Sequence, residues 1–242
     1  DDLLNQLQQY APVTNVHAWT WLYDDYQLLN ARHPQHCSFG IVPPQQTYDQ
    51  VVVFLPKSKE LLQYVLHQAA MHLAPNGQIL LVGEKRTGIE RASKQLSQFG
   101  STLKIDSARH CQLWLCHELE TQEEKPLQEW VNEYQVNVED IGQSINVISL
   151  PGVFSHGRLD QGSALLVENL TNLPKGDLLD FGCGAGVVGT LLKKIYPAQT
   201  VYFLDVDAFA LESTRLTLAA NNIALDDTVQ IIAGRGVIDA PQ

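Results

Sequence analysis

Short apolar runs alternate with longer segments of helical spacing in the first half of the chain. The run 48–54 (YDQVVVF) is rich in β-branched residues and is followed closely by Pro56, which predicts a strand. Over 59–72 the apolar side chains recur three and four positions apart, which predicts a helix. The same reasoning predicts helices over 3–10 and 88–99, a turn at 74–77, and strands over 16–21, 78–82, 102–105 and 111–116.

The second half repeats this alternation more regularly. The pattern predicts strands over 177–181, 200–204 and 229–233, separated by helices over 187–196 and 208–221. On the last helix we expect Leu211, Leu218 and Ala219 to face inward. A β-α-β-α-β series is half of a doubly wound parallel sheet, so the pattern indicates α/β architecture. The outer strand pairs do not follow, and we therefore expect this domain to be truncated after its third strand.

An acidic run separates the two halves. Residues 118–140 hold eight carboxylates against Lys125 alone, namely Glu118, Glu120, Glu123, Glu124, Glu129, Glu133, Glu139 and Asp140. Such a run is usually a solvated linker or helix face. We therefore expect one domain over 1–120, an acidic linker over 121–145 and a second domain over 146–242.

Composition narrows the class of protein. With 45% hydrophobic and 18% charged residues, the 242-residue chain can bury a core. A net charge of −11 argues against a protein that coats nucleic acid without specificity, although it allows a local basic patch. The sequence shows neither a membrane-length apolar run nor a signal peptide after Asp1, and its four cysteines are scattered. We expect a cytoplasmic protein with no membrane partner.

The segment 180–186 (DFGCGAG) carries the clearest chemical signal. Asp180 ends an otherwise apolar strand, where an unpaired carboxylate is costly, so we expect it to face a polar ligand or partner. Gly182, Gly184 and Gly186 remove every second Cβ atom from the turn into the next helix. A ligand can therefore approach the backbone amides at that helix N-terminus.

The next strand ends in a second acidic segment, Asp205-Val206-Asp207. A carboxylate at that place can accept both hydroxyls of a ribose, and Val206 can lie against an adenine ring. Two ligands fit this arrangement. NAD fits because Gly184-x-Gly186-x-x-Gly189 matches the dinucleotide fingerprint. S-adenosylmethionine fits because its sites use an acid-x-Gly-x-Gly-x-Gly pattern.

The acid before the glycines favours S-adenosylmethionine. Its sulfonium and amino groups are cationic, whereas Asp180 would repel the pyrophosphate of NAD. A third interpretation, in which the glycines merely form a tight turn, needs no ligand.

Several segments of the second half resemble the bacterial ribosomal RNA small subunit methyltransferase C family, the 16S rRNA guanine-N2 methyltransferases. They are 150–155 (LPGVFS), 159–163 (LDQGS), 179–187 (LDFGCGAGV) and 218–221 (LAAN). The first half is similar to the N-terminal domain of the same family at 55–57 (LPK), 82–88 (VGEKRTG) and 106–111 (DSARHC). The resemblance covers nearly the whole chain. Its GVFS and DSAR segments are more specific than the glycine loop, which many methyltransferases share.

The resemblance implies two tandem Rossmann-like class I methyltransferase domains. The first is degenerate, has no glycine-rich acidic motif and helps to hold RNA; the second transfers a methyl group from S-adenosylmethionine to the exocyclic N2 of a guanine. The implied partner is ribosomal RNA or the small ribosomal subunit. Methylation of large-subunit rRNA, a noncatalytic RNA-binding module and an NAD oxidoreductase remain as alternatives.

The resemblance also implies the cofactor residues. Asp180, Gly182, Gly184 and Gly186 would line the methionine end, Asp160 and Gly162 would lie near it, Asp205 would bind the ribose, and Val206 would contact the adenine. Arg235 departs from the pattern, because it stands where an acid or amide often accepts from the adenine amino group, and arginine cannot accept. The catalytic Asn-Pro-Pro-Phe motif is expected beyond Gln242. We therefore assign no catalytic residue and expect this chain to be inactive alone.

Basic residues concentrate in the segment 85–109. Six Lys and Arg against Glu90 and Asp106 give a local charge of +4. We expect RNA phosphate contacts from Lys85, Arg86, Arg91, Lys94 and Arg109, with Lys104 nearby, the alternative being an ordinary charged helix face. The His-Cys pairs suggest zinc, but Cys111 and Cys116 fall on opposite faces of a strand, so we expect no metal site.

Overall fold

A computed structural model describes residues 16–139, 142–153, 161–169, 173–236 and 239. They fall into two compact units. Unit 2 comprises Pro44–Trp130, and unit 1 combines the chain up to Pro43 with the part from Val131 onward. This division differs from the predicted domains at 1–120 and 146–242 in two places. The stretch 16–43 folds with the C-terminal part, and the predicted linker is divided, its residues up to Trp130 belonging to unit 2 and those from Asn132 contributing to a β-hairpin of unit 1.

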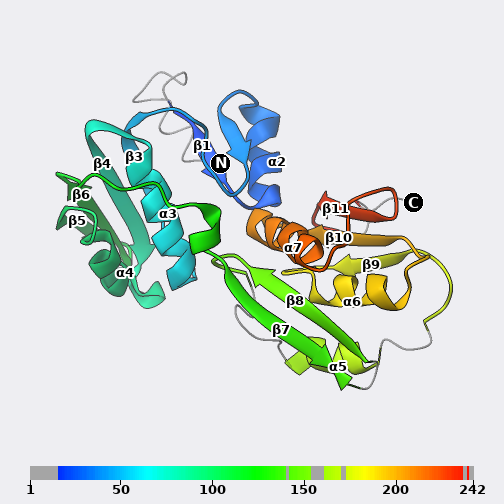
Figure 1. The fold of residues 1–242 in the computed structure, drawn as a ribbon. Helices are drawn as coiled ribbons and strands as arrows, with labels where there is room; N and C mark the ends of the chain where they lie inside the picture. Colours follow the sequence, from blue (N-terminus) through cyan, green and yellow to red (C-terminus); the bar gives the residue numbers. More distant parts are fainter. Residues whose placement is uncertain (1–15, 140–141, 154–160, 170–172, 237–238, 240–242) are drawn as a thin grey trace. The chain divides into compact units, whose positions relative to one another are not determined.

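Unit 2 is a four-stranded mixed sheet with two helices. Its strands are β3 (Tyr48–Phe54), β4 (Leu73–Glu84), β6 (Cys111–His117) and β5 (Ser101–Ala108), in the order β3-β4-β6-β5 (Figure 1). β3 and β4 are parallel, and the other two pairings are antiparallel. The helices α3 (Lys59–Met71) and α4 (Ile89–Leu96) pack against each other and the sheet, and two short 3-10 helices, η2 (Lys85–Thr87) and η3 (Leu127–Glu129), complete the unit. The strands and helices predicted for this region are confirmed, whereas the turn predicted over 74–77 is wrong, because these residues are part of β4, where its register with β3 shifts.

The pleat of the unit 2 sheet separates a buried face from an exposed one. Val53 and Leu81 pair in register and are at most 4% exposed, together with Leu66 of α3. One residue earlier and later in β3, Val52 and Phe54 point the other way and are 40% and 55% exposed. The helices therefore cover one face of this sheet.

Unit 1 contains a three-stranded parallel sheet in the order β11-β10-β9. Its strands are β9 (Leu178–Phe181), β10 (Val201–Asp205) and β11 (Val229–Ala233), joined through α6 (Val187–Ile195) and α7 (Ala208–Ala220) (Figure 1). The predicted β-α-β-α-β series is thus confirmed. The prediction for the inward face of α7 is partly wrong, because Ala219 is exposed and the fully buried positions include Ser213, Thr214 and Thr217.

A hairpin explains the burial of Ser213 and Thr217, whereas Thr214 Oγ1 donates to the Gly184 carbonyl in the glycine loop (3.0 Å). β7 (Asn132–Val138) and β8 (Gln143–Ser149) pair antiparallel, and β8 runs along α7. Thr217 Oγ1 accepts from the Ile148 N–H (3.0 Å) and donates to its carbonyl (3.2 Å). Asn221 makes the same pair of bonds with the Asn146 backbone, and Ser213 Oγ accepts from the Leu150 N–H (2.9 Å).

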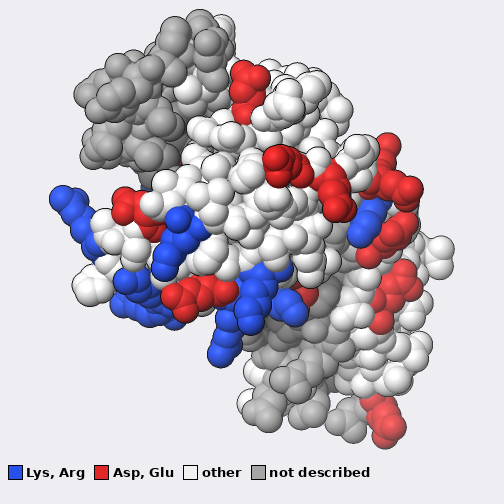
Figure 2. All heavy atoms as spheres, turned by 90° about the vertical axis from the view of Figure 1, so that its left-hand side faces the viewer, with Lys and Arg blue, Asp and Glu red and all other residues white. Residues whose placement is uncertain are grey.

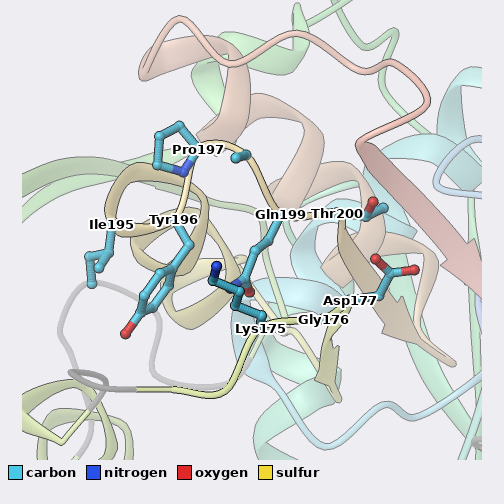
Figure 3. A pocket seen from close by; sticks show the side chains of 9 residues that line it. Lys175, Gly176, Asp177, Ile195, Tyr196, Pro197, Gln199 and Thr200 are labelled. Atoms are coloured by element: carbon cyan, nitrogen blue, oxygen red, sulfur yellow. The ribbon is translucent and has the colours of Figure 1, made fainter.

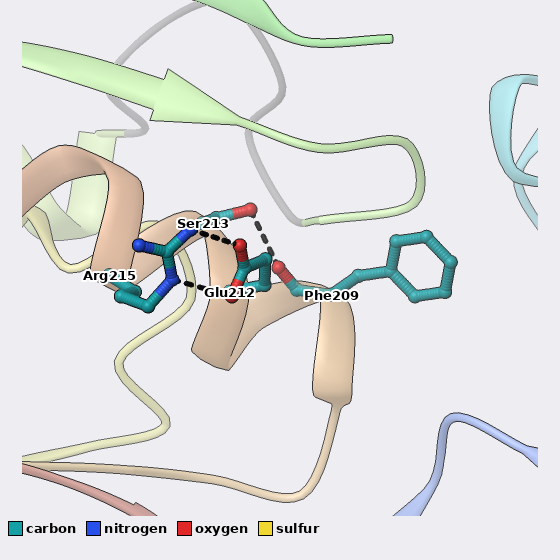
Figure 4. Close-up of polar contacts among 4 residues, drawn as sticks. All are labelled: Phe209, Glu212, Ser213 and Arg215. Atoms are coloured by element: carbon teal, nitrogen blue, oxygen red, sulfur yellow. Dashed lines mark hydrogen bonds and ion pairs between the residues drawn. The ribbon is translucent and has the colours of Figure 1, made fainter. Parts of the chain in front are cut away.

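We call Ser213, Thr217 and Asn221 the α7 ladder. Four helical residues rise about 6 Å and two strand residues about 6.6 Å, so side chains on successive turns of the helix reach alternate residues of the strand. Ser213 Oγ also donates to the Phe209 carbonyl (2.6 Å), while Arg215 and Glu212 form an ion pair on the same helix (Figure 4). The ladder therefore satisfies backbone groups that a neighbouring strand would otherwise bond.

The stretch 16–43 completes unit 1. β1 (Ala18–Thr20) and β2 (Cys37–Phe39) are parallel and flank α2 (Tyr23–Arg32). β1 confirms the strand predicted at 16–21. α2 and β2 were not predicted. α2 buries no residue and so lacks the apolar stripe that predicts a helix. The helix predicted over 3–10 lies outside the described residues. α5 (Gln161–Glu168) also belongs to unit 1, and no helix in the described ranges has the length and apolar character to cross a membrane.

Candidate cofactor site and basic surface

The glycine loop between β9 and α6 leaves open space beside its backbone. Gly182 and Gly184 adopt positive φ angles of +69° and +55°, and a Cβ atom on either would meet no other atom within 4 Å. Strand β10 fixes the loop, since the N–H groups of Gly182 and Cys183 both donate to the Leu204 carbonyl at 2.8 and 3.1 Å. These two glycines have the geometry expected where a ligand approaches the backbone closely.

Two further glycines allow elements to pack closely. A Cβ atom on Gly186 would lie 2.9 Å from the Thr214 side chain, and one on Gly189 would lie 2.2 Å from the Phe203 ring. Gly186 therefore lets α6 approach α7, and Gly189 lets it approach β10. Close packing of the helix on a strand is also the role of the third glycine in the dinucleotide fingerprint, so Gly189 does not discriminate between NAD and S-adenosylmethionine.

Asp180 is almost completely buried at the end of β9, with 9% of its surface exposed. Its Oδ2 accepts a hydrogen bond from the Gly189 N–H (2.8 Å), in the first turn of α6. Burial raises the pKa of Asp180 to about 6, and the nearby Asp205 acts in the same direction, while the Gly189 N–H opposes the shift. The expected polar partner of this carboxylate is thus the N-terminus of α6. The carboxylate charge lies beneath the glycine loop.

Asp205 joins the glycine loop to the end of β10. Its Oδ2 accepts from the Gly184 N–H and its Oδ1 from the Asp207 N–H, both at 3.0 Å. Asp207 in turn caps α7 by accepting from the Phe209 N–H (2.8 Å). Burial raises the pKa of Asp207 to about 6, and Asp205 again contributes. The structure therefore brings together the two predicted segments and adds Asp207, which the repeated acids of the LDVD sequence could have indicated.

The other predicted cofactor residues are Val206, Gly162 and Asp160. Val206 follows Asp205 directly in the segment 205–207, which we call the acidic turn. Gly162 is exposed near the start of α5, so its place beside the cofactor stays a prediction, while Asp160 lies outside the described residues. Arg235 follows β11 near the acidic turn, because the preceding Gly234 N–H donates to the Asp205 carbonyl (3.0 Å).

A carboxylate stands beside Arg235. Asp239 Oδ2 accepts from the backbone N–H groups of Arg235 (2.9 Å) and Gly236 (3.2 Å). The Arg235 side chain is exposed. A carboxylate held by the backbone N–H groups of residues 235 and 236 therefore lies four residues after Arg235.

A separate hollow of about 570 Å³ lies at the opposite end of β9. It is lined by residues 175–177, before the strand, and 195–200, at the end of α6 and beyond (Figure 3). None of the predicted cofactor residues lines it. The candidate site is therefore the loop edge of the sheet.

The predicted RNA-contacting residues are all exposed in unit 2. Lys85 and Arg86 lie in η2, Arg91 and Lys94 on α4, and Lys104 and Arg109 at or next to β5. The Lys85 N–H donates to the His110 carbonyl (2.9 Å), which joins η2 to the β5–β6 turn. Figure 2 shows Lys and Arg side chains gathered on part of this side of the molecule, with carboxylates between them.

The tip of the β5–β6 turn is conformationally costly. Arg109 and His110 have φ angles of +47° and +66°, which non-glycine residues rarely adopt. The turn therefore presents a basic residue where glycine or asparagine would be more stable. Arg86 forms an ion pair with Glu84, so part of the surface charge is neutralised. No cluster of three or more metal-binding side chains occurs within the described ranges.

The fold and this site define an α/β methyltransferase: a glycine loop after the first strand, an acid after the second, and a parallel sheet. Two family descriptions match, the methyltransferase small domain N-terminal over residues 1–134 and the methyltransferase small domain over 144–238. The chain belongs to the ribosomal RNA small subunit methyltransferase C family. It is 50% identical over 242 residues to the Stutzerimonas stutzeri protein of that name and 48% identical over 241 residues to that of Pseudomonas fluorescens.

The chain spans 69% of the length of both relatives. A solved T. thermophilus 16S rRNA N2-guanine methyltransferase, in complex with AdoMet and guanosine, is similar in fold. Its TM-score is 0.78 at 22% identity, covering 93% of this chain and 60% of the other. The family confirms the resemblance seen in the sequence and favours the small-subunit over the large-subunit activity.

Proposed function

We propose that this chain serves in the S-adenosylmethionine-dependent methylation of guanine N2 in 16S ribosomal RNA, with the cofactor in unit 1 and RNA phosphates on unit 2. The observation that carries the proposal is the bond between Gly184 N–H and Asp205, which places the glycine loop and the acidic turn at one sheet edge. Family membership supplies the substrate class. The first domain is degenerate in this view and contributes binding only.

The residues present fit the cofactor. The space beside Gly182 and Gly184, which a Cβ atom would fill, accommodates its methionine part. Asp205 retains lone pairs that can accept from the ribose hydroxyls, and Val206 would contact the adenine ring. Asp180 supplies negative charge for the ammonium and sulfonium groups. When bound, the cofactor supplies an electrophilic methyl group.

We further propose that guanine methylation requires an Asn-Pro-Pro-Phe segment to position the base, as the family resemblance implies. The exocyclic amine of guanine is a poor nucleophile, because its lone pair is delocalised into the ring, so its N–H groups must be held by acceptors. The Asn-Pro-Pro-Phe segment expected for this role does not occur in the sequence. The chain is therefore expected to bind cofactor without methylating RNA by itself, and turnover by this chain would contradict that expectation.

Calorimetry tests the cofactor site. We expect the wild-type chain to bind S-adenosylhomocysteine but not NADH, and Asp205→Ala to weaken that binding at least tenfold, because the ribose loses its acceptor. Asp226→Ala removes an exposed carboxylate elsewhere in unit 1 and serves as the control. Binding of NADH alone, or equal affinity of the Asp205 and Asp226 variants, would refute the assignment.

The salt dependence of RNA binding tests the basic surface. Removal of one phosphate contact is expected to reduce the slope of log affinity against log salt concentration by about 0.7 to 0.9. The triple variant Lys85→Gln, Arg86→Gln, Arg91→Gln should therefore flatten the slope by about 2 for a transcribed 16S rRNA. The matched control neutralises Lys59, Lys175 and Arg215, which are also exposed. An equal slope for the two triple variants would rule out this surface.

A further inference from the structure

A stretch assigned to the first family domain packs onto the acidic turn of the second. The N-terminal family description covers residues 1–134, yet residues 16–43 fold within unit 1. Within this stretch, Trp21, Leu22 and Tyr23 connect β1 to α2 and run beside residues 206–208. The contact therefore joins sequence from one family domain to the proposed cofactor site of the other.

Two main-chain hydrogen bonds clamp the acidic turn on both sides of Asp207. The Tyr23 N–H donates to the Val206 carbonyl and the Ala208 N–H donates to the Trp21 carbonyl, each at 2.8 Å. Leu22 and Asp207 consequently form an antiparallel bridge. The clamp fixes the peptide groups that flank Asp207.

Aromatic packing supports the same contact. The Trp21 ring meets the Phe209 ring edge to face at 6.2 Å, and Phe209 is completely buried at the start of α7. Trp19 packs edge to face against Trp21 at 5.6 Å. Since such ring pairs have defined geometry, they hold the clamp in register.

We propose that Trp21–Tyr23 is a positioning segment for the adenosine part of the cofactor. The inference rests on the proposed function of the site. The Asp207 N–H donates to Asp205, the ribose acceptor, and Val206 is the adenine contact, so the conformation of 205–207 decides whether both groups are presented together. A turn already held in that conformation loses less entropy on binding than a mobile one. Sequence from the first family domain thus tunes cofactor affinity in the second.

Tyr23 offers a sharp test because it is the first residue of α2. Proline is well tolerated at the first helical position, and Leu22 before it is extended (φ −101°, ψ 121°), as a residue before proline must be. Tyr23→Pro therefore removes the N–H that bonds Val206 while α2 is retained. Tyr23→Ala is the matched control, because it also loses the ring contacts with Tyr26 and Phe39 but keeps the N–H.

Affinity for S-adenosylhomocysteine and for adenosine should be measured by calorimetry, with folding checked by circular dichroism. We expect Tyr23→Pro to bind both ligands about 3- to 10-fold more weakly than Tyr23→Ala. A purely structural role would leave the affinities of the two folded variants equal, and that result would overturn the inference. Failure of the wild-type chain to bind S-adenosylhomocysteine would overturn the proposed function and this inference with it.

A second variant decides the question if Tyr23→Pro does not fold. Trp21→Leu keeps both backbone hydrogen bonds but removes the ring that packs on Phe209, and Trp114→Leu, in β6 of unit 2, is its control. A weaker affinity for adenosine in Trp21→Leu alone supports the positioning segment. Equal affinities in the two variants contradict it.

Discussion

Glycines at the ends of parallel strands have opposite surroundings in the two units. At the end of β4 in unit 2, a Cβ atom on Gly83 would lie 2.8 Å from the Leu55 side chain and 3.1 Å from Ile89. After β9 in unit 1, a Cβ atom on Gly182 or Gly184 would meet nothing within 4 Å. The first kind of glycine serves packing, and the second preserves space. Unit 2 fills this place with its own side chains, which supports the proposal that its domain holds no cofactor.

Among the predictions, substitution of Gly189, a glycine that serves packing in unit 1, should lower stability the most. Gly189→Ala places a methyl group 2.2 Å from the Phe203 ring, so α6 or the ring must shift. We expect the free energy of unfolding to fall by about 3 kcal/mol, measured by urea denaturation with the m value unchanged. A loss below about 0.5 kcal/mol would show that the packing tolerates a methyl group and that the two kinds of glycine are not distinct.

The open glycine should affect binding more than stability. Gly184→Ala strains a residue with φ of +55°, which costs about 1 kcal/mol, and fills the space proposed for the cofactor. We expect affinity for S-adenosylhomocysteine to fall at least tenfold by calorimetry. Gly88→Ala is the control, because Gly88 in unit 2 also has positive φ and open surroundings. A similar loss of affinity in the control would exclude a local effect.

Acidification should change the stability of unit 1 and its ligand affinity in opposite directions. Asp180 and Asp207 have pKa values of about 6, above the ordinary 3.8, so the folded state binds more protons than the unfolded state between these values. The ligand-free chain should therefore become more stable through these two groups as pH falls from 7 to 5. Affinity for S-adenosylhomocysteine should weaken over the same range, because its ammonium group loses a negative partner.

Asp180→Asn checks this pH dependence. We expect the variant to lose part of both changes, followed by urea denaturation and calorimetry at matched pH values. An unchanged pH dependence in the variant would show that Asp180 is not responsible. Asp207, which caps α7, would then be the remaining candidate.

The sequence predicted the regular elements well and the supporting contacts poorly. Strands and helices with apolar periodicity were found in both units, and the glycine loop and Asp205 do lie together. The hairpin was missed although Tyr134, Val136 and Val138 alternate with polar residues, because the acidic run suggested a linker. The contact of Trp21–Tyr23 with residues 206–208 could not be predicted, since nothing local indicates a pairing between segments so far apart.

The separate roles of the three loop glycines and of Gly189 in α6 also could not be predicted. Their spacing alone suggests one shared purpose. Only the neighbours of each missing Cβ atom show that Gly182 and Gly184 face open space, whereas Gly186 and Gly189 are packed against Thr214 and Phe203.

The α7 ladder has a consequence for how this sequence can diverge. Thr217 and Asn221 bond to the main chain of β8 at residues 146 and 148, whose side chains take no part in these bonds. The side chains at 146 and 148 can therefore change to any residue except proline, which lacks the N–H that these bonds need, while the helix positions are constrained by main-chain atoms. Over evolutionary time the helix should retain its small hydroxyl and amide residues and positions 146 and 148 should drift, whereas the buried Ile145 and Val147 should stay apolar.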